Sequence, residues 1–124
     1  MTDSMDLKEI DRQEKIQAEI LHYFHQALKN EEFQIYFQPK VSPASGKISS
    51  AEVLVRWLRD GKMRWFPAVY IPLFEQNGFV ISLDYYVYEK TFRWLQEFSR
   101  QLPAAFRISL NVSPLHFEEP DILP

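Results

Sequence analysis

Two opposite charges, Glu52 and Arg56, lie within SSAEVLVRW (49–57), an otherwise apolar stretch that predicts a buried strand. A carboxylate and a guanidinium at these positions could line a ligand-binding pocket. They could instead form an ion pair, or reach solvent near the end of the strand. Residues four apart on a strand are separated by about 13 Å, which is too far for a direct ion pair. The spacing therefore leaves the pocket and the solvent-exposed arrangement open.

The elements that must position these residues follow from hydrophobic periodicity and turn residues. In chain order we expect a helix at about 6–30, a strand at 33–39, a turn at 42–46, a strand at 47–57, a loop at 58–66, a helix from Pro67 to about Asn77, a helix from Ser82 or Asp84 to Arg100, and a strand at 106–113. The link between the first two strands is too short for a crossover, so they should form an antiparallel hairpin. The third strand follows two helices, which predicts a right-handed crossover to a parallel neighbour. These elements define an α/β protein.

Alternation along the three strands separates an apolar face from a polar face. If the hairpin pairs Val41 with Lys47, Gln38 lies opposite Ser50 and shares the polar face of the second strand. Four side chains would then gather on the polar face of the sheet: Gln38, Glu52, Arg56 and Asn111. Helices would cover the apolar face. A sheet with a polar inner face is what a ligand-lined barrel requires.

Composition limits the classes of protein to consider. The chain has 124 residues, 46% of them hydrophobic and 15% aromatic, so we expect one folded domain rather than a disordered chain. The net charge is -3, which excludes the basic footprint of a DNA- or RNA-binding surface and means that a phosphate ligand would need local cations or a metal. There is no cysteine, no secretory signal and no apolar run of membrane-spanning length. We therefore expect a soluble, cytoplasmic protein without a membrane segment.

Three stretches carry a further pattern in a fixed order. The first, FQIYFQPKVSPASGKISSAEVLVRW, contains Glu52-Val53-Leu54 followed by Arg56-Trp57. The second is FPAVYIPLFEQNGFVISLDYYVYEKTFRWL, and the third is SLNVSP. Together they resemble the signature strand, the Pro-x-x-Phe-Ile-Pro-x-x-Glu-x-x-Gly helix and the Asn-x-Ser strand of the EAL-domain phosphodiesterases of cyclic di-GMP. The resemblance extends from the N-terminal helix to NVSP, which is nearly the whole chain.

The resemblance implies a partial TIM-type (β/α) barrel of the EAL type, with its first strand antiparallel to the second. It also implies Mg²⁺ or Mn²⁺ at the strand ends and hydrolysis of cyclic di-GMP to the linear dinucleotide. Glu52 and Asn111 match metal ligands of the family, Arg56 matches a phosphate-binding arginine, and Gln38 and Leu54 match substrate-binding positions. No catalytic residue beyond the metal ligands falls within this chain. Oxygen ligands suit hard cations, paired metals can activate water, and arginine matches phosphate.

This sequence departs from the family pattern in two ways. Val53 stands where the triplet has alanine, on the helix-facing side, and should change little beyond packing. The later carboxylates and the catalytic lysine of the family lie beyond the end of this sequence, since an eight-stranded barrel needs roughly 250 residues. We expect residues 1–30 to be a helix leading into the domain and 31–124 to be its N-terminal half. The chain alone should be inactive, and should self-associate or require a missing C-terminal half.

A non-catalytic alternative remains open at this stage: a degenerate EAL-like module that binds nucleotide or another protein. Asn111 could satisfy backbone groups at a strand end, Gln38 could be an ordinary hydrogen-bonding residue, and Arg56 could extend to solvent. Glu75, at a helix end, is interpreted as structural. The remaining candidates have more ordinary explanations, because the histidines lack metal-site spacing and the aromatics suit a core: His22, His25, His116, Trp57, Trp65 and Trp94.

Overall fold

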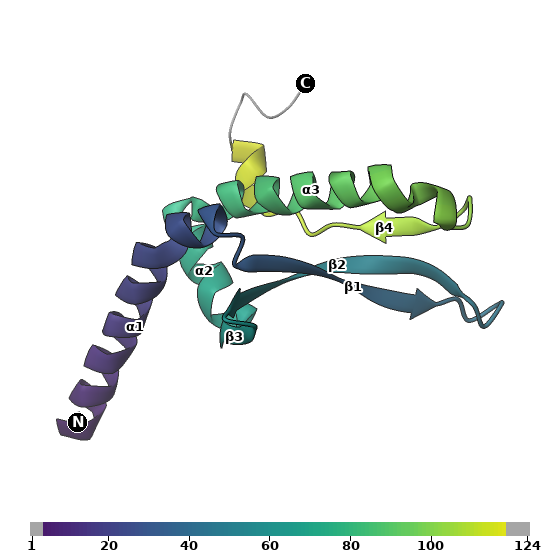
Figure 1. The fold of residues 1–124 in the computed structure, drawn as a ribbon. Helices are drawn as coiled ribbons and strands as arrows, with labels where there is room; N and C mark the ends of the chain where they lie inside the picture. The colour runs from purple at the N-terminus through teal and green to yellow at the C-terminus, as the bar shows by residue number, and fades with distance from the viewer. Residues whose placement is uncertain (1–3, 119–124) are drawn as a thin grey trace.

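The computed structural model describes residues 4–118 as four strands and three long helices with two short 3-10 turns (Figure 1). In chain order the elements are α1 (Ser4–Lys29), β1 (Phe33–Val41), β2 (Ile48–Arg59), β3 (Lys62–Trp65), α2 (Pro67–Asn77), α3 (Phe79–Phe98), η1 (Ser99–Gln101), β4 (Arg107–Ser109) and η2 (Pro114–Glu118). No helix among the described residues is long and apolar enough to cross a bilayer.

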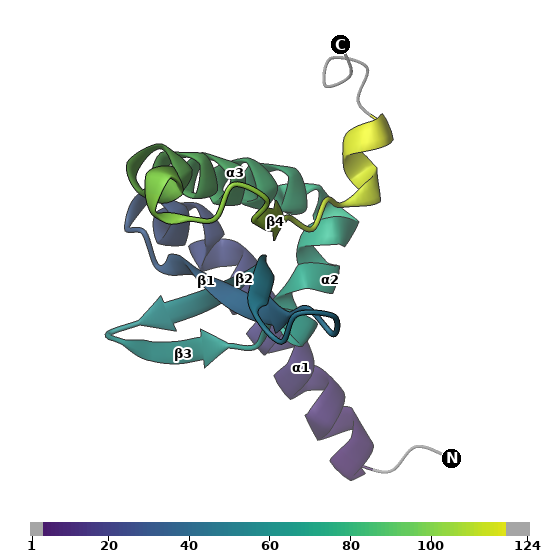
Figure 2. The ribbon, with the colours of Figure 1, turned by 90° about the vertical axis from the view of Figure 1, so that its right-hand side faces the viewer.

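The sheet has β2 at its centre. β1 pairs with β2 in antiparallel fashion along its whole length, and β4 pairs with β2 in parallel fashion after the two helices. Both predicted directions are therefore confirmed. β4 is shorter than the predicted strand at 106–113, because pairing with β2 ends at Ser109. Figure 2 shows α3 on one side of this sheet.

The predicted register of the first hairpin is wrong by two residues. Gln38 lies opposite Glu52 rather than Ser50, and the ladder is irregular between Lys40 and Val41. The turn between the strands is closed by a hydrogen bond from the Ser42 N–H to the carbonyl of Lys47 at 2.9 Å. A shift of two residues keeps each side chain on its predicted face, because strand side chains alternate with period two. The error therefore brings Gln38 closer to Glu52 and leaves the face assignment intact.

The expectation of a loop at 58–66 is also wrong. β2 continues to Arg59, and β3 returns along its other edge, pairing Trp57 with Trp65. The turn between them is Asp60-Gly61, with φ of 54° and 76°. Positive φ at both central residues is the geometry that a two-residue hairpin turn needs, and Asp-Gly is a strong signal for it.

The two helices after the sheet meet at one glycine. α2 spans Pro67–Asn77 as predicted, and Gly78 ends it in the left-handed conformation with φ of 86°. α3 begins at Phe79, earlier than the predicted Ser82 or Asp84, and the Asn77 Oδ1 accepts its first N–H at 3.0 Å. A glycine accommodates this backbone at no steric cost, so α2 and α3 follow each other without a loop.

The core lies where α1, α2 and α3 pack against the open end of the β1–β2 hairpin, opposite its turn. Its largest fully buried side chains are aromatic, and their rings contact one another in tilted or edge-on pairs: Phe24, Phe33, Trp57, Tyr70 and Phe74. Only the second half of α1 contributes to this cluster. Its first half extends away from the rest of the molecule (Figure 1), with residues 6–15 all exposed.

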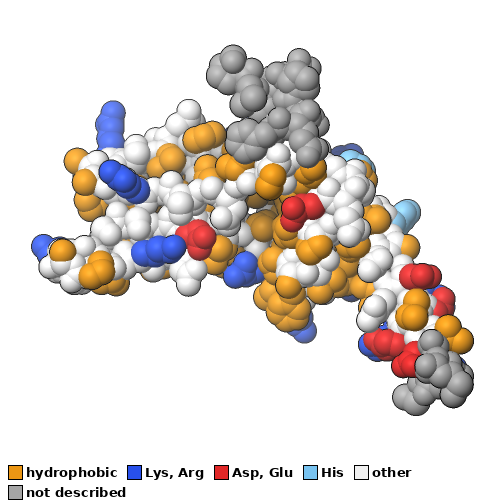
Figure 3. Space-filling model, turned by 180° about the vertical axis from the view of Figure 1, so that it is seen from behind, with side chains coloured by type: hydrophobic (Ala, Val, Ile, Leu, Met, Phe, Trp, Pro, Cys, Tyr) orange, Lys and Arg blue, Asp and Glu red, His pale blue; other side chains and the backbone are white. Residues whose placement is uncertain are grey.

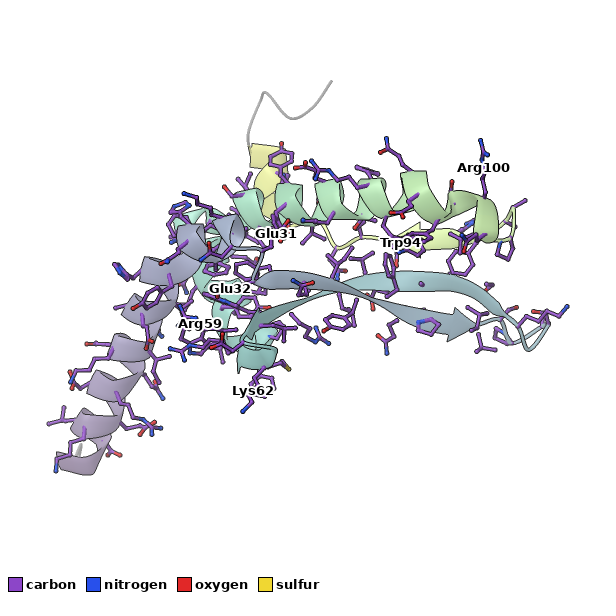
Figure 4. All side chains as sticks on the ribbon, in the orientation of Figure 1. Glu31, Glu32, Arg59, Lys62, Trp94 and Arg100 are labelled. Atoms are coloured by element: carbon purple, nitrogen blue, oxygen red, sulfur yellow. The ribbon has the colours of Figure 1, made fainter. Side chains whose placement is uncertain are left out.

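Specific contacts attach α3 to β1. The Tyr86 hydroxyl donates to the carbonyl of Phe33 at 2.9 Å, and Lys90 bonds to Glu31 just before β1. Further along, Trp94 extends from α3 toward the sheet (Figure 4), where its ring centroid is 4.4 Å from that of Phe37. These contacts fix the helix over the apolar face of the hairpin.

Tyr70 has a hydroxyl that is buried without a partner among the described residues. Burial raises the pKa of this hydroxyl above its ordinary value, with a smaller opposing effect from Arg56. An unsatisfied buried hydroxyl costs about 1–3 kcal/mol. We therefore expect Tyr70→Phe to raise the free energy of unfolding by about 1 kcal/mol. Tyr86→Phe is the matched control, measured in the same way by urea denaturation. It should lower the free energy of unfolding, because the Tyr86 hydroxyl donates a hydrogen bond to the carbonyl of Phe33. Equal changes in both variants would refute the argument.

The sheet leaves strand edges open among the described residues. β1 pairs only with β2, and Val41 and Ile48 at the end of the hairpin are 60% and 52% exposed. An open strand edge is a template for pairing with another chain. We predict that the 124-residue chain self-associates. Analytical ultracentrifugation should show dimers or larger species at micromolar concentration. A monodisperse monomer with a concentration-independent unfolding transition would contradict this prediction.

Candidate functional site

Glu52 lies at the centre of the polar face. It pairs with Gln38 on β1 and with Ser109 on β4, so side chains from three strands meet at this level of the sheet. Directly opposed residues on neighbouring strands have Cβ atoms about 5 Å apart. The Glu52 carboxylate is half-buried and forms no hydrogen bond or ion pair with any described residue. It is therefore available to a ligand.

A pocket of about 370 Å³ opens beside β2, between the segments that pair with β3 and β4. Leu54, Arg56 and Asn111 line it, which brings together three of the five residues predicted for the site. Apolar side chains from both helices form its walls: Ile71, Val80, Leu83 and Val87. Figure 3 shows hydrophobic side chains gathered in the middle of the rear face, with charged side chains spread around them.

Arg56 does not pair with Glu52. Its Nη1 donates to the carbonyl of the neighbouring Val55 at 2.8 Å, which leaves most of its donors free to face the pocket. This agrees with the expectation from strand spacing that these two charges are too far apart for a direct ion pair. Arg56 is half-buried, so its guanidinium is also partly removed from solvent. A partly desolvated guanidinium with free donors can hold a phosphate through two parallel hydrogen bonds.

Gln38 and Glu52 do not line the pocket itself. Gln38 is exposed, and no described residue forms a hydrogen bond with its side chain. Both lie closer to the closed end of the hairpin, since Gln38 is paired with Glu52 and Glu52 is two positions from Leu54. The pocket itself is also lined by Val53 and Val55, which alternate to the helix-facing side of β2. Four of the predicted residues (Gln38, Glu52, Leu54 and Arg56) thus share one face of the hairpin, whereas Asn111 lies beyond the paired part of β4. Three of the five line the pocket.

The candidate metal ligands among the described residues are of the type that a divalent cation binds, but there are too few of them for a complete site. Glu52 offers a carboxylate and Asn111 an amide carbonyl, which are the ligand types that hard cations take. Within residues 4–118 no three histidine, cysteine, aspartate or glutamate side chains come together to hold a metal ion. Mg²⁺ requires near-octahedral coordination. The described residues could therefore contribute ligands to a metal site, but they do not complete one.

Two carboxylates in the pocket were not predicted as site residues. Glu75, which was interpreted as structural, lines the pocket from α2, and Asp84 lines it from α3. Glu75 forms no hydrogen bond or ion pair with the described residues. Asp84 bonds to His116, whose Nε2 lies 2.8 Å from the Asp84 Oδ2. His116 belongs to η2 and is buried. No local sequence signal links residues so far apart.

Tyr88 lies beside this pair on α3. Burial, with the nearby charges of Asp84 and Tyr85, raises the pKa of the Tyr88 hydroxyl to about 12. The hydroxyl is therefore neutral at physiological pH and can donate. It lies 3.5 Å from the backbone carbonyl of Asn111, at the outer limit of a hydrogen bond.

The antiparallel hairpin, the parallel β4 and the helices on one side of the sheet define part of a (β/α) barrel. The family model "EAL domain" matches residues 23–124. The protein sll1895 of Synechocystis sp. is 34% identical over 114 residues, covering 92% of this chain and 16% of that protein. The "Probable cyclic di-GMP phosphodiesterase PdeG" of Escherichia coli is 31% identical over 94 residues, covering 76% of this chain and 18% of PdeG. The chain belongs to the EAL domain family.

The same relationship appears in three dimensions. The structure described as "PaMucR Phosphodiesterase, c-di-GMP complex" aligns with a TM-score of 0.74 at 26% identity, covering 84% of this chain and 42% of that one. The fold is therefore that of part of an EAL barrel, with the first strand antiparallel to the second as predicted. This chain spans less than a fifth of the length of the curated relatives described here.

Proposed function

We propose that this chain supplies the N-terminal half of the barrel in a cyclic di-GMP phosphodiesterase domain, over residues 31–124, with 1–30 as the helix that leads into it. The observation that carries the proposal is the pocket beside β2, where Arg56, Leu54 and Asn111 meet next to the unpaired carboxylate of Glu52. The kinship to proteins described as cyclic di-GMP phosphodiesterases supports it.

The roles proposed for the residues are those that the family resemblance implies, and the chemistry of each side chain suits its role. Arg56 holds a phosphate of cyclic di-GMP, and Leu54 and Gln38 contact the nucleotide. Glu52 and Asn111 donate oxygen ligands to Mg²⁺ or Mn²⁺, which would supply an activated water and charge stabilisation at phosphorus. We infer that the remaining ligands and the groups that transfer protons come from outside residues 4–118, because within these residues no three histidine, cysteine, aspartate or glutamate side chains come together to hold a metal ion.

The shortage of ligands also supports a second candidate function. A domain that binds cyclic di-GMP without hydrolysing it needs an arginine for a phosphate and an apolar wall for the nucleotide, roles that Arg56 and the apolar lining of the pocket could fill. Turnover discriminates the two candidates, because the binding module gives none in any context.

A chimera tests the enzyme proposal. Residues 23–124 of this chain replace the aligned segment of the PaMucR phosphodiesterase, and hydrolysis of cyclic di-GMP is followed with Mg²⁺ or Mn²⁺. We expect turnover by the chimera and none above background by the 124-residue chain alone. A chimera that is folded by circular dichroism, binds cyclic di-GMP and gives no turnover would favour the binding module. Turnover by the chain alone would refute the expectation that it is inactive.

Arg56→Ala in the chimera should chiefly weaken nucleotide binding. Loss of a charge-assisted contact to phosphate costs about 1.5–3 kcal/mol, so KM should rise roughly tenfold or more with a smaller change in kcat. Arg100→Ala is the control, because it removes an exposed arginine in η1, just after the end of α3 (Figure 4). An unchanged KM in Arg56→Ala would exclude Arg56 from the phosphate site.

A further inference from the structure

The segment that carries Asn111 is held against α3 rather than by the sheet. Strand pairing ends at Ser109, so Asn111 lies beyond the last ladder contact of β4. From there to η2, three contacts with α3 fix the chain. The Ser113 N–H donates to the Asp84 Oδ2 at 3.2 Å, His116 bonds to the same oxygen at 2.8 Å, and the Tyr88 hydroxyl lies near the Asn111 carbonyl.

The pair formed by Asp84 and His116 is well shielded from solvent. The side chains are 14% and 4% exposed, respectively. A carboxylate only accepts hydrogen bonds, so Nε2 of His116 must carry the hydrogen that it donates. Asp84 thus receives two donors from one short segment, a backbone N–H at position 113 and an imidazole at position 116. Bonds to a partly buried carboxylate are stronger than neutral ones, and loss of either donor leaves it undersatisfied.

Asp84 also faces the pocket that Asn111 and Arg56 line. The same carboxylate is therefore a wall of the site and the anchor of the segment that delivers one of its candidate ligands. Glu75 on α2, the other carboxylate of the pocket, has no such contact among the described residues. This difference identifies Asp84, rather than Glu75, as the acidic residue that shapes the site.

We propose that Asp84 and His116 are positioning residues, which hold the segment 111–116 on α3 and so place Asn111 in the pocket beside Arg56. This inference rests on the proposed role of Asn111 in the function above. Asp84 also lines the pocket, but the role proposed here for the pair is to position the segment. Its effect passes through the backbone of Ser113.

Ring packing is the competing explanation for the place of His116. Its ring centroid lies 5.4 Å from that of Tyr85 and 6.1 Å from that of Tyr88, so an aromatic ring alone could anchor η2. Two substitutions separate the possibilities. His116→Phe keeps a ring and removes the donor, whereas His116→Gln removes the ring and keeps an N–H that can reach Asp84.

The experiment uses the whole 124-residue chain and NMR. Amide hydrogen exchange at Ser113 and the side-chain amide resonance of Asn111 are measured in wild type, Asp84→Ala, His116→Phe and His116→Gln. Glu89→Ala removes an exposed carboxylate from the same helix and serves as the matched control. We expect exchange at Ser113 to accelerate about tenfold or more in Asp84→Ala and His116→Phe, with a shifted Asn111 resonance. His116→Gln and Glu89→Ala should resemble wild type.

The inference would be overturned if His116→Phe left both the exchange rate at Ser113 and the Asn111 resonance unchanged. It would also be overturned if His116→Gln accelerated exchange at Ser113 and shifted the Asn111 resonance. His116→Phe decides the matter even if Asp84→Ala fails to fold. Titration of the same proteins with cyclic di-GMP and Mg²⁺ distinguishes this inference from the proposed function. If the variants show the expected differences in exchange but the Arg56 resonance of wild type does not shift on addition of nucleotide, the result would count against the proposed function and support the positioning role.

Discussion

Glu52→Ala is expected to lower kcat/KM for cyclic di-GMP hydrolysis in the chimera by at least about 100-fold. The substitution removes one of two candidate metal ligands on this chain, and stabilisation by a bound metal is worth several kcal/mol at roughly tenfold per 1.4 kcal/mol. Glu52 has no structural partner among the described residues, so its loss should not unfold the protein. Steady-state kinetics over a range of Mn²⁺ concentrations measure the effect.

The matched control is Glu97→Ala, which removes an exposed carboxylate from α3. It should leave kcat/KM within about twofold of wild type, as expected for surface substitutions. A Glu52→Ala chimera with wild-type kinetics would show that this strand does not carry a metal ligand. Partial recovery of Glu52→Ala at high Mn²⁺ would instead support the assignment, since weakened metal binding can be offset by concentration.

The second large effect concerns stability. Trp57 is fully buried, contacts the rings of Phe33, Tyr70 and Phe74, and donates its Nε1–H to the Glu32 Oε1 at 2.9 Å. Truncating a buried tryptophan costs about 3–5 kcal/mol, which is a large part of the total stability of a small domain. We expect Trp57→Ala to be largely unfolded by circular dichroism, or to unfold at far lower urea concentration than wild type.

Two variants separate the parts of this effect. Trp57→Phe keeps a ring but leaves the Glu32 carboxylate without that donor, and should cost about 1–3 kcal/mol. Glu32 retains Arg59 at 3.8 Å, and these two residues lie together near the start of β1 (Figure 4). Trp94→Ala removes a half-buried tryptophan and should cost clearly less than Trp57→Ala. Equal losses at the two tryptophans would contradict the assignment of Trp57 to the centre of the core.

The sequence predicted the features that depend on short-range patterns. Alternation placed Glu52 and Arg56 on the polar face, Pro67 and Gly78 bounded α2, and the short link required the antiparallel hairpin. Leu54, Arg56 and Asn111 do share one pocket. Face and direction follow from local periodicity, which is why these expectations survive without three-dimensional information.

The errors concern features that depend on three-dimensional geometry rather than on the local sequence pattern. The hairpin register depends on an irregularity at Lys40 and Val41, which no hydrophobic pattern encodes. β3 was predicted to be a loop, although the Asp60-Gly61 turn was a readable signal for a hairpin. The contact between Asp84 and His116 joins two elements across β4 and has no local signature.

The measurement that tests the central claim most directly is an NMR titration of the 124-residue chain with cyclic di-GMP in the presence of Mg²⁺. If the polar face of the sheet is one wall of a cyclic di-GMP site, the perturbed resonances should cluster on five residues: Gln38, Glu52, Leu54, Arg56 and Asn111. Arg56→Ala should remove most of the response. Resonances that shift only on the outer face of α3, or no shifts at millimolar nucleotide, would contradict the assignment of this face as the binding site.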